Sequence, residues 1–405
     1  MTILPRIKQI VQERFGTFFD SIEGFYLKNF LILIQGLLTN SYTSISAIAA
    51  DEHYGVSHTT LFRFLQSHEE FWVTMKNLLF SLFRRQMVGE GTSQHRHILV
   101  IDDTQIARRG KLIPFASKHY DHCDKRFILS QVILTIGEVK NKVFQPLDML
   151  FAKPPKEEGE PYRSKIEMAI SWLKDHFIRG AIIIADSWYT NAPLIESCKK
   201  LFESDFIGRF KSNIILCVDG EWKKVKDLVA KATMNRTFRL GNKVIRYRTY
   251  DAEVQSLRIP VRVVVTELED GSRALLACTD RNLPSEAIIE FYSLRWTIES
   301  FFKFAKQNLS LAKCHSRDES AQSHFLILIA IAYLIFNDLL RILQTSEENL
   351  THCELFYVIR LAFSIFAVTY FSRSSVRTTE SFLSECRYSK ASQRVLVLLL
   401  HPRTG

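Results

Sequence analysis

The spacing of hydrophobic and polar positions changes along the chain and predicts an α/β core. Apolar runs of strand length occur at HILVID (97–102), RFILSQVILTIGEV, VFQPLDMLF and AIIIAD (181–186). An amphipathic segment with helical spacing, SKIEMAISWLKDHF, precedes the last of these runs. The order strand, strand, strand, helix, strand builds a sheet covered by helices. We therefore predict an α/β core that begins near residue 93.

A second region, from about 205 to 280, alternates apolar and polar residues with the period of two that is typical of strands. Its runs are separated by Asp-Gly and Gly-Asn turns. Helical spacing returns after this region. The predicted order is a helical N-terminal region (1–92), the first part of the core (93–210), a β-rich insertion (211–282), a core helix (283–318) and a helical C-terminal region (319–405). The polar segments GEGTSQHRH (89–97) and KPPKEEGEP (153–161) are predicted to form a boundary and a loop.

The N-terminal region contains a pair of short helical patterns, SYTSISAIAADEHYGVSHTTLFRFLQ. The first reaches a turn at Gly55, and Ser57 is placed to cap the second. This arrangement resembles a helix-turn-helix, whose second helix presents polar side chains to DNA. A plain helical bundle explains the pattern equally well. The candidate DNA-facing residues are Thr59, Thr60, Arg63 and Gln66.

Composition narrows the class of protein. The 405 residues carry a net charge of +10, which favours a polyanionic partner such as nucleic acid or an acidic membrane surface. The seven cysteines include no CxxC pair, which argues against a disulfide framework or a cysteine-rich zinc site and fits a reducing cytoplasm. The apolar run Phe325–Phe336 is shorter than the roughly twenty residues of a membrane span. We expect a buried core helix there, no membrane partner and no export signal.

Two of the predicted strands end in aspartate. In the first, IDDT (101–104), successive side chains point to opposite faces, so only one of Asp102 and Asp103 can face a site. The D-x-T order favours Asp102, and Asp103 remains the alternative. In the second, Asp186 follows the apolar run and is expected at the carboxyl edge of the sheet. An aspartate there also suits the cap of a following helix.

A third carboxylate lies in the segment EFYSLRWTIESFFKFAKQN (290–308), which is predicted to be one helix. The residues that share one face span an arc of about 80°. They are Tyr292, Arg295, Glu299, Lys303 and Lys306, and Leu294, Ile298, Phe301 and Ala305 lie opposite. On that face Glu299 can bind a metal ion, and the cations and the phenol can bind phosphates. A solvated face with ion pairs to Glu299 is the alternative.

These motifs together resemble those of a known family. The Tyr-x2-Arg-x3-Glu-x6-Lys pattern at Tyr292, Arg295, Glu299 and Lys306 resembles the YREK signature of DDE transposases of the insertion-sequence-four type, which move DNA by cut and paste. Its RW-x-IE wording is matched by Trp296 and Ile298. The segments IDDT and ADSWY (185–189) resemble the first and second acid motifs of that group. The three acids occur in the expected order, 84 and 113 residues apart, and the likeness covers roughly residues 98–310.

The resemblance implies a fold, a chemistry and a set of partners. It implies an RNase H-like core in which Asp102, Asp186 and Glu299 converge on two Mg²⁺ or Mn²⁺ ions, the hard cations that such carboxylates bind. It assigns DNA phosphates to Tyr292, Arg295, Lys303 and Lys306. The implied partners are double-stranded DNA, namely the terminal inverted repeats and the target, and a second copy of the chain on that DNA. The implied location is the bacterial cytoplasm, at the nucleoid.

Relatives commonly use an aromatic residue of the insertion to hold a flipped base, and Trp222 is the tryptophan of the predicted insertion. Two other functions remain open from the sequence. One is a catalytically silent DNA-binding protein that has kept the fold. The other is an RNase H-fold nuclease without strand transfer.

Overall fold

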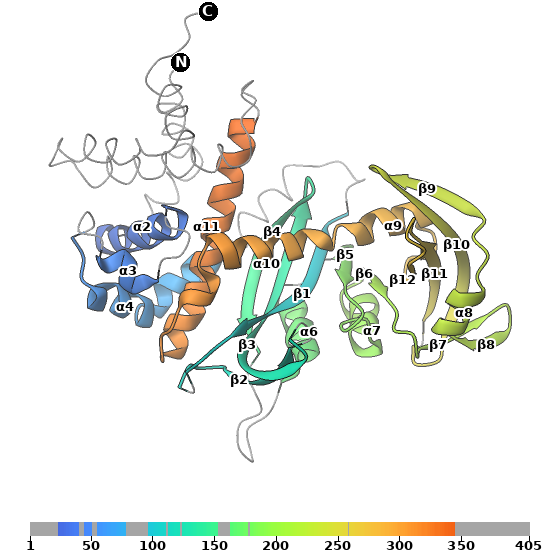
Figure 1. Cartoon of the computed structure of the whole chain (residues 1–405), viewed down its shortest axis with the longest axis horizontal. Coiled ribbons are helices and arrows are strands. Elements are labelled where there is room, and N and C mark those ends of the chain that lie inside the picture. Colours follow the sequence, from blue (N-terminus) through green and yellow to red (C-terminus); the bar gives the residue numbers. More distant parts are fainter. Residues whose placement is uncertain are drawn as a thin grey trace, which may run out of the picture. The chain divides into compact units, whose positions relative to one another are not determined.

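The structure is a computed structural model of the whole chain, shown in Figure 1. The residues that it describes are 23–39, 44–50, 55–77, 96–110, 112–121, 124–152, 163–176, 179–257 and 259–344. The predicted loop at 153–161, nearly all of the predicted boundary at 89–97, and the C-terminal region beyond 344 lie outside the described residues. The chain divides into two compact units, one of residues 1–77 and 303–405 and one of residues 78–302.

The second unit has a mixed α/β fold around one large mixed sheet. Its described strands form a 12-stranded sheet with the order β2-β3-β1-β5-β6-β12-β11-β10-β7-β8, with β4 pairing to β3 and β9 to β10. In the core, β1 pairs antiparallel with β3 and parallel with β5, and β5 pairs parallel with β6. The core strands are β1 (Ile98–Ala107), β2 (Ser117–Asp121), β3 (Arg126–Lys140), β4 (Val143–Phe151), β5 (Ile182–Ala185) and β6 (Asp205–Arg209).

The predicted hairpin around GEVKNK is confirmed by the structure. Strands β3 and β4 are antiparallel neighbours joined at Asn141 and Lys142, both of which have positive φ. Two consecutive residues with positive φ match the right-handed twist of a tight hairpin. The predicted strand at 97–102 is too short, because β1 continues to Ala107 while β3 remains its neighbour.

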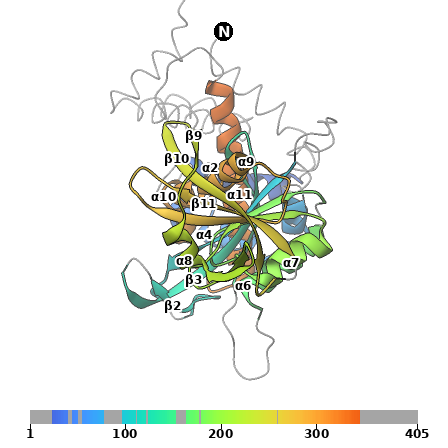
Figure 2. The same cartoon turned by 90° about the vertical axis from the view of Figure 1, so that its right-hand side faces the viewer.

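Alternation along β1 decides which side chains meet the helices on one face of the sheet. Leu99 and Ile101 belong to the hydrophobic core cluster that includes Trp172 of α6 (Lys165–His176) and Leu194 of α7 (Ala192–Leu201). In Figure 2, α6 and α7 lie on one side of the sheet and α9 (Ser285–Ser293) lies on the other. The two faces therefore have separate packing partners, which fixes the register of the strand.

The predicted β-rich region contributes further strands of the same sheet, because β12 pairs with β6. It also contains a short helix, α8 (Val225–Lys231), that the alternation did not predict. The strands of this region are β7 (Ile215–Val218), β8 (Glu221–Lys224), β9 (Arg236–Leu240), β10 (Lys243–Val254), β11 (Pro260–Glu267) and β12 (Arg273–Cys278).

A cluster of charged side chains links the start of β6 to the chain on either side of it. Asp205 accepts hydrogen bonds from Lys199 Nζ at 2.7 Å and Thr279 Oγ1 at 2.8 Å, and it forms an ion pair with Arg96. Arg96 also donates to Asp280 at 2.8 Å. Burial of the Asp205 carboxyl tends to raise its pKa, but the hydrogen bonds from Lys199, Arg96 and Thr279 outweigh burial and hold the pKa below its usual value.

We expect the substitution Asp205→Asn to lower the free energy of unfolding at pH 7 by about 2 kcal/mol, a moderate value because Arg96 and Lys199 stay partly exposed to screening water. A carboxyl with a lowered folded-state pKa stabilises the fold above its unfolded pKa of about 4, and this stabilisation is lost as the pH falls through the folded pKa. The difference from wild type should therefore shrink below about pH 4 in urea unfolding series. Asp175→Asn, at an exposed aspartate of α6, is the matched control; a pH-independent difference for Asp205→Asn would contradict the argument.

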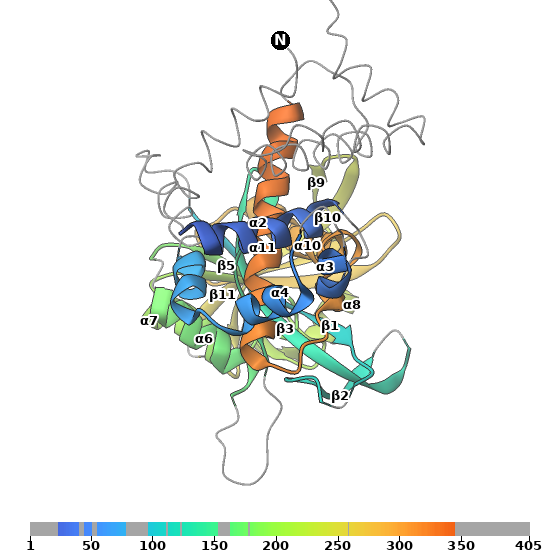
Figure 3. The ribbon, with the colours of Figure 1, turned by 90° about the vertical axis from the view of Figure 1, so that its left-hand side faces the viewer.

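The first unit includes the helices α2 (Gly24–Thr39), α3 (Ile45–Ala50), α4 (His58–Gln66) and α11 (Glu319–Gln344), drawn in blue and orange in Figure 3. Residues 69–77, which carry Trp72, are also helical. A ring contact and a hydrogen bond join the N-terminal helices to α11. The ring of Trp72 stacks on that of His324, with centroids 4.9 Å apart, and His324 Nδ1 lies 2.7 Å from the carbonyl oxygen of Leu65.

Helix α11 contains the apolar run that was predicted to be a core helix. Its segment Glu319–Asp338 is long and apolar enough to cross a membrane by length and composition, yet 72% of that window is buried in the structure. Such burial is the pattern of a core helix, as the sequence predicted.

The predicted cap of α4 is present, because Ser57 Oγ accepts the amide of Thr60 at 3.1 Å. Thr59, Arg63 and Gln66 are exposed on this helix, whereas Leu61, Phe64 and Leu65 are buried. Thr60 is half-buried, and its hydroxyl lies 2.8 Å from that of Ser57, so its place among the DNA-facing residues remains a prediction.

Candidate active site

Two of the three predicted acids lie side by side at the point where the parallel strands β1 and β5 stop pairing. The last pair in this register is Ile101 with Ala185, so the next residue of each strand is an aspartate, Asp102 and Asp186. Neighbouring strands are about 4.8 Å apart, which places these two carboxylates within direct electrostatic reach. The sequence predicted each aspartate at a strand end but could not supply the register that makes them neighbours.

Asp102 and Asp103 face different surroundings. Asp103 lies on the face of β1 that carries Leu99 and Ile101, and its Oδ1 atom binds Lys165 Nζ at 2.6 Å and the Tyr189 hydroxyl at 2.7 Å. Asp102 lies on the opposite face, where its Oδ2 atom is 3.2 Å from Arg295 Nη1. Its Oδ1 atom accepts the amide of Asp103 at 2.8 Å. Of the two aspartates, Asp102 is the one that meets the predicted partners on the third motif.

The side chain of Asp186 is oriented by its own turn. Its Oδ1 atom accepts the backbone amides of Trp188 at 2.8 Å and Tyr189 at 3.1 Å, and its carbonyl oxygen accepts the Thr190 hydroxyl at 2.6 Å. The helix that follows, α7, has Asn191 as its cap, so the alternative that Asp186 caps that helix is wrong. Both amides bind the same carboxylate oxygen of Asp186, and Oδ2 accepts neither of them.

The prediction of one continuous helix over 290–308 is wrong, because two helices occupy this segment, α9 and α10 (Trp296–Asn308). Between them the amides of Leu294 and Arg295 bond to Phe291 and Tyr292, three residues back. The Thr297 hydroxyl donates a hydrogen bond to the Leu294 carbonyl oxygen at 2.7 Å. Hydrogen bonds of this kind interrupt the α-helix at residues 294 and 295. Tyr292, Arg295 and Glu299 nevertheless remain neighbours across the turn, because the Arg295 guanidinium lies 5.9 Å from the centre of the Tyr292 ring and pairs with Glu299.

Arg295, at this turn, connects Glu299 to Asp102. Its Nη1 atom lies 2.7 Å from Glu299 Oε1 and 3.2 Å from Asp102 Oδ2, and the side chain is only 11% exposed. One guanidinium nitrogen thus separates the two carboxylates. The Nε atom of Arg295 is buried and has no hydrogen-bond partner among the residues the structure describes. The predicted i,i+4 ion pair of Arg295 and Glu299 is therefore present, and in it a buried arginine next to Asp102 pairs with a carboxylate that stays 39% exposed.

The electrostatics of the site follow from this crowding. Burial of the Asp102 carboxyl, and next the negative charge of Asp186, raise its pKa to about 7, although the Asp103 amide and Arg295 act in the opposite direction. Burial raises the pKa of the Tyr292 phenol despite the nearby charges of Arg295 and Arg209, so that phenol remains a hydrogen-bond donor at neutral pH. Burial and the nearby charge of Asp186 therefore disfavour a second negative charge on Asp102, and Arg295 does not fully offset these two effects.

The residues fit a divalent cation by their chemistry, since hard oxygen donors and an excess of negative charge are what Mg²⁺ and Mn²⁺ require. Within the described ranges, however, no group of three His, Cys, Asp or Glu side chains is close enough to enclose a metal ion. Arg295 accounts for this, because its Nη1 atom lies between the first and third acids. Asp102 and Asp186 adjoin each other, and Glu299 adjoins the same guanidinium.

Lys303 and Lys306 continue along α10 and are exposed. Sequence reasoning missed a further cation. Arg209 ends β6, and because Gly208 pairs with Ala185, Arg209 is the next neighbour of Asp186 along the sheet edge. The signal was available, since DFIGR is an apolar run ending in arginine, but only the register places it beside an acid.

Trp222, predicted to hold a flipped base, lies on β8 and is 55% exposed. Strand β8 ends the sheet path, six strands from β5. Two other exposed tryptophans lie in the motifs of the acids themselves, Trp188 and Trp296, which are 41% and 60% exposed. The assignment of Trp222 remains a prediction.

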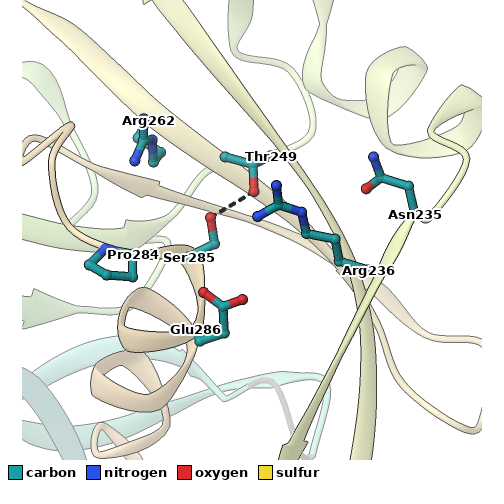
Figure 4. A pocket seen from close by; sticks show the side chains of 7 residues that line it. All are labelled: Asn235, Arg236, Thr249, Arg262, Pro284, Ser285 and Glu286. Carbon is teal, nitrogen blue, oxygen red and sulfur yellow. Dashed lines mark hydrogen bonds between the residues drawn. The ribbon is translucent and has the colours of Figure 1, made fainter.

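A pocket of about 300 Å³ opens on the β-rich region, away from these acids along the chain (Figure 4). Two arginines and a pair of hydroxyls, Thr249 and Ser285 at 2.7 Å, line it. The cations there already have acidic neighbours, because Arg262 binds Asp251 and Arg236 acts on the carboxyl of Glu286. The full lining is Asn235, Arg236, Thr249, Arg262, Pro284, Ser285 and Glu286.

Comparison with known proteins places this site in a family. Residues 93–335, more than half of the chain, match the family model described as Transposase DDE domain. A candidate transposase of Sinorhizobium fredii, y4zB, is 27% identical over 166 residues, which are 36% of this chain and 46% of that protein, so this chain spans less than half the length of that relative. The cryo-EM structure of the piggyBac transposase synaptic complex with hairpin DNA is similar with a TM-score of 0.46 and 12% identity, covering 95% of this chain and 78% of that one. By the family match, which covers Asp102, Asp186 and Glu299, the chain belongs to the family of transposase DDE domains.

Proposed function

We propose that this chain is a cut-and-paste DNA transposase of the YREK subgroup, which cleaves the phosphodiester bonds at the ends of a DNA element and joins the freed 3′-hydroxyls to target DNA. The observation that carries the proposal is the strand register that sets Asp102 beside Asp186, together with the guanidinium of Arg295 that joins Asp102 to Glu299. Clustered carboxylates of this kind are what phosphoryl transfer by divalent cations requires.

The topology supports an RNase H-like core. The strands β4-β3-β1-β5-β6 are neighbours in that order, with an antiparallel meander followed by two parallel strands. Asp102 lies on the central strand, β1, and Asp186 directly follows the end of its parallel neighbour, β5. The β-rich region is then an insertion that extends the sheet before the chain returns with α9 and α10.

We assign two Mg²⁺ or Mn²⁺ ions to Asp102, Asp186 and Glu299. When bound, the ions activate the attacking oxygen and neutralise charge on the phosphodiester and on the leaving oxygen. The protein residues provide the rest. Asp186 is held by two amides at Oδ1, so Oδ2 is the oxygen we assign to a metal ion.

Cations and a protonated phenol border the acids and are assigned to DNA phosphates. The buried Nε atom of Arg295 has no acceptor among its described neighbours, so it can donate to a phosphate oxygen of the DNA. Tyr292 donates its phenol proton, and Arg209 adds charge beside Asp186. Lys303 and Lys306 extend the positive charge along α10, where screened contacts with the DNA backbone position the substrate.

DNA recognition by the first unit is a second part of the proposal. The exposed face of α4, with Thr59, Arg63 and Gln66, has the polar character of a helix that enters the major groove. Arg63→Ala should weaken binding of the full-length chain to duplex DNA by about tenfold, measured by fluorescence anisotropy. Equal binding by Arg63→Ala and wild type would favour the plain helical bundle. Two copies on DNA and a location at the bacterial nucleoid also belong to the proposal, because two element ends need two sites.

The test is a cleavage and joining assay with the purified full-length chain, Mn²⁺ and duplexes carrying the DNA that flanks its gene. We expect excised ends and strand-transfer products. Cleavage of those ends without transfer from precut 3′-hydroxyl ends would favour an RNase H-fold nuclease. Binding without any cleavage would favour a silent DNA-binding protein.

A further inference from the structure

Asp103, the second aspartate of the DD pair, is not assigned to a metal ion, yet it contacts both Asp102 and a residue that holds Asp186. Asp103 faces away from Arg295 and Glu299, yet its amide holds Asp102 Oδ1 at 2.8 Å. Its carboxylate Oδ1 atom accepts the Tyr189 hydroxyl at 2.7 Å. Tyr189, in turn, gives its backbone amide to Asp186 Oδ1 at 3.1 Å. Asp103 and Tyr189 therefore each donate a backbone amide to one of the two acids, and their own side chains bind each other.

We infer that Asp103 and Tyr189 form a positioning link that fixes the spacing and orientation of the Asp102 and Asp186 carboxylates for metal binding. Neither residue is assigned to contact the metal or the DNA. The inference rests on the proposed function, since it concerns the same two acids. Partners that orient metal ligands set metal affinity, typically by about 10- to 100-fold on removal.

Burial gives this link its rigidity. Tyr189 is fully buried, with the core cluster around its ring, so its hydroxyl has one fixed direction. Burial of the phenol, and then the Asp103 charge and hydrogen bond, raise its pKa well above the usual value, and the hydroxyl therefore remains the proton donor of the pair. A buried phenol with a short bond to a carboxylate restrains the turn after β5 relative to strand β1.

Lys165 keeps Asp103 in this role. Its ammonium nitrogen binds the same Asp103 oxygen at 2.6 Å and lies 3.9 Å from the centre of the Trp188 ring. This ion pair partly offsets the negative charge of Asp103 on the face of β1 that lies away from Arg295 and Glu299. Trp188 donates the other amide that binds Asp186. The Lys165 ammonium therefore contacts both Asp103 on β1 and Trp188 in the turn after β5.

The experiment compares Mn²⁺ binding and metal dependence of the full-length chain with and without the link. Tyr189→Phe removes one hydroxyl, and we expect Mn²⁺ affinity by calorimetry to fall by about tenfold. The Mn²⁺ concentration for half-maximal cleavage should rise by a similar factor, whereas the rate at saturating Mn²⁺ stays within about threefold of wild type. A merely structural hydroxyl would not produce this separation of metal affinity from maximal rate.

The matched control is Tyr247→Phe, which removes another buried phenol hydroxyl bound to a carboxylate, that of Glu286 in the β-rich region. It should leave Mn²⁺ affinity unchanged. A second pair of variants guards against misfolding of Tyr189→Phe. Asp103→Asn retains an oxygen that accepts the Tyr189 hydroxyl, and Asp103→Ala does not, so the shift in Mn²⁺ affinity should be smaller for asparagine than for alanine.

The outcomes separate the link from the proposed function. If wild type neither binds Mn²⁺ nor cleaves DNA, the proposed function fails. If wild type does both and Tyr189→Phe has the same Mn²⁺ affinity as Tyr247→Phe, the positioning link is overturned. Equal effects of Asp103→Asn and Asp103→Ala would also contradict it, since the hydrogen-bond acceptor would then be irrelevant.

Discussion

Asp186→Asn is expected to lower Mn²⁺-dependent cleavage of DNA ends by at least ~10²–10³-fold, because it removes a charged metal ligand from a site in which electrostatic stabilisation dominates. Asparagine preserves the shape of the side chain and keeps an oxygen that accepts the Trp188 and Tyr189 amides. The turn after β5 should therefore be retained. The loss would then reflect the missing charge and not a displaced backbone.

The measurement is the initial rate of end cleavage by the full-length variant, with duplex binding and thermal unfolding measured in parallel. Asp227→Asn, at an exposed aspartate of α8, is the control for a lost surface carboxylate and should cleave like wild type. DNA affinity of Asp186→Asn should be equal to or higher than that of wild type, since one negative charge near the phosphates is gone. Full cleavage activity in this variant would exclude Asp186 as a ligand.

Much of the core could be predicted from the sequence because its strands are apolar runs of the right length. The isoleucine run before Asp186 and the hairpin at Asn141 and Lys142 are local features, and both occur as predicted. The β-type alternation after residue 205 likewise predicted strands. Local patterns determine elements of this kind, since the periodicity of two depends only on which face is buried.

Which strands pair, and in which register, could not be predicted from these local patterns. Nothing in the two motifs states that Ile101 pairs with Ala185, which makes Asp102 and Asp186 neighbours and adds Arg209 to the same edge. The break between α9 and α10 was missed for a related reason. The hydroxyl of Thr297 competes for a backbone carbonyl at the turn, and helical spacing of apolar residues continues on both sides of it.

The choice between Asp102 and Asp103 shows where sequence reasoning ends. Alternation correctly stated that the two side chains face opposite sides of the strand, but it could not say which side holds the other acid motifs. The structure places Arg295 and Glu299 with Asp102 and places Lys165 and Tyr189 with Asp103. Asp102 and Asp103 therefore each have a cationic partner, Arg295 on one face of the strand and Lys165 on the other.

Arg295→Met is expected to change metal binding and cleavage in opposite directions. The guanidinium now lies between Asp102 and Glu299 and supplies positive charge where we assign a cation, so its removal should tighten Mn²⁺ binding by about 3- to 10-fold, as expected for one unit charge a few Å away in a partly solvated site. Methionine has a similar length and fills the volume without charge. Cleavage should nevertheless fall by about 10²-fold or more, because the phosphate loses the fixed, charged donor that we assign to it.

Calorimetry with Mn²⁺ and end-cleavage rates on the same preparations test this, with Arg281→Met as the control for a lost arginine, half-exposed and paired with Asp251. Arg295→Lys should give an intermediate result, since it keeps the charge but not the planar fork. If Mn²⁺ binding and cleavage fell together in Arg295→Met, Arg295 would act by organising the acids and not by binding phosphate. Opposite changes would mean that the guanidinium pairs with Asp102 and Glu299 only while no metal ion is bound. Once a metal ion binds these acids, the guanidinium would bind the DNA phosphate, so one buried arginine would serve both states of the site.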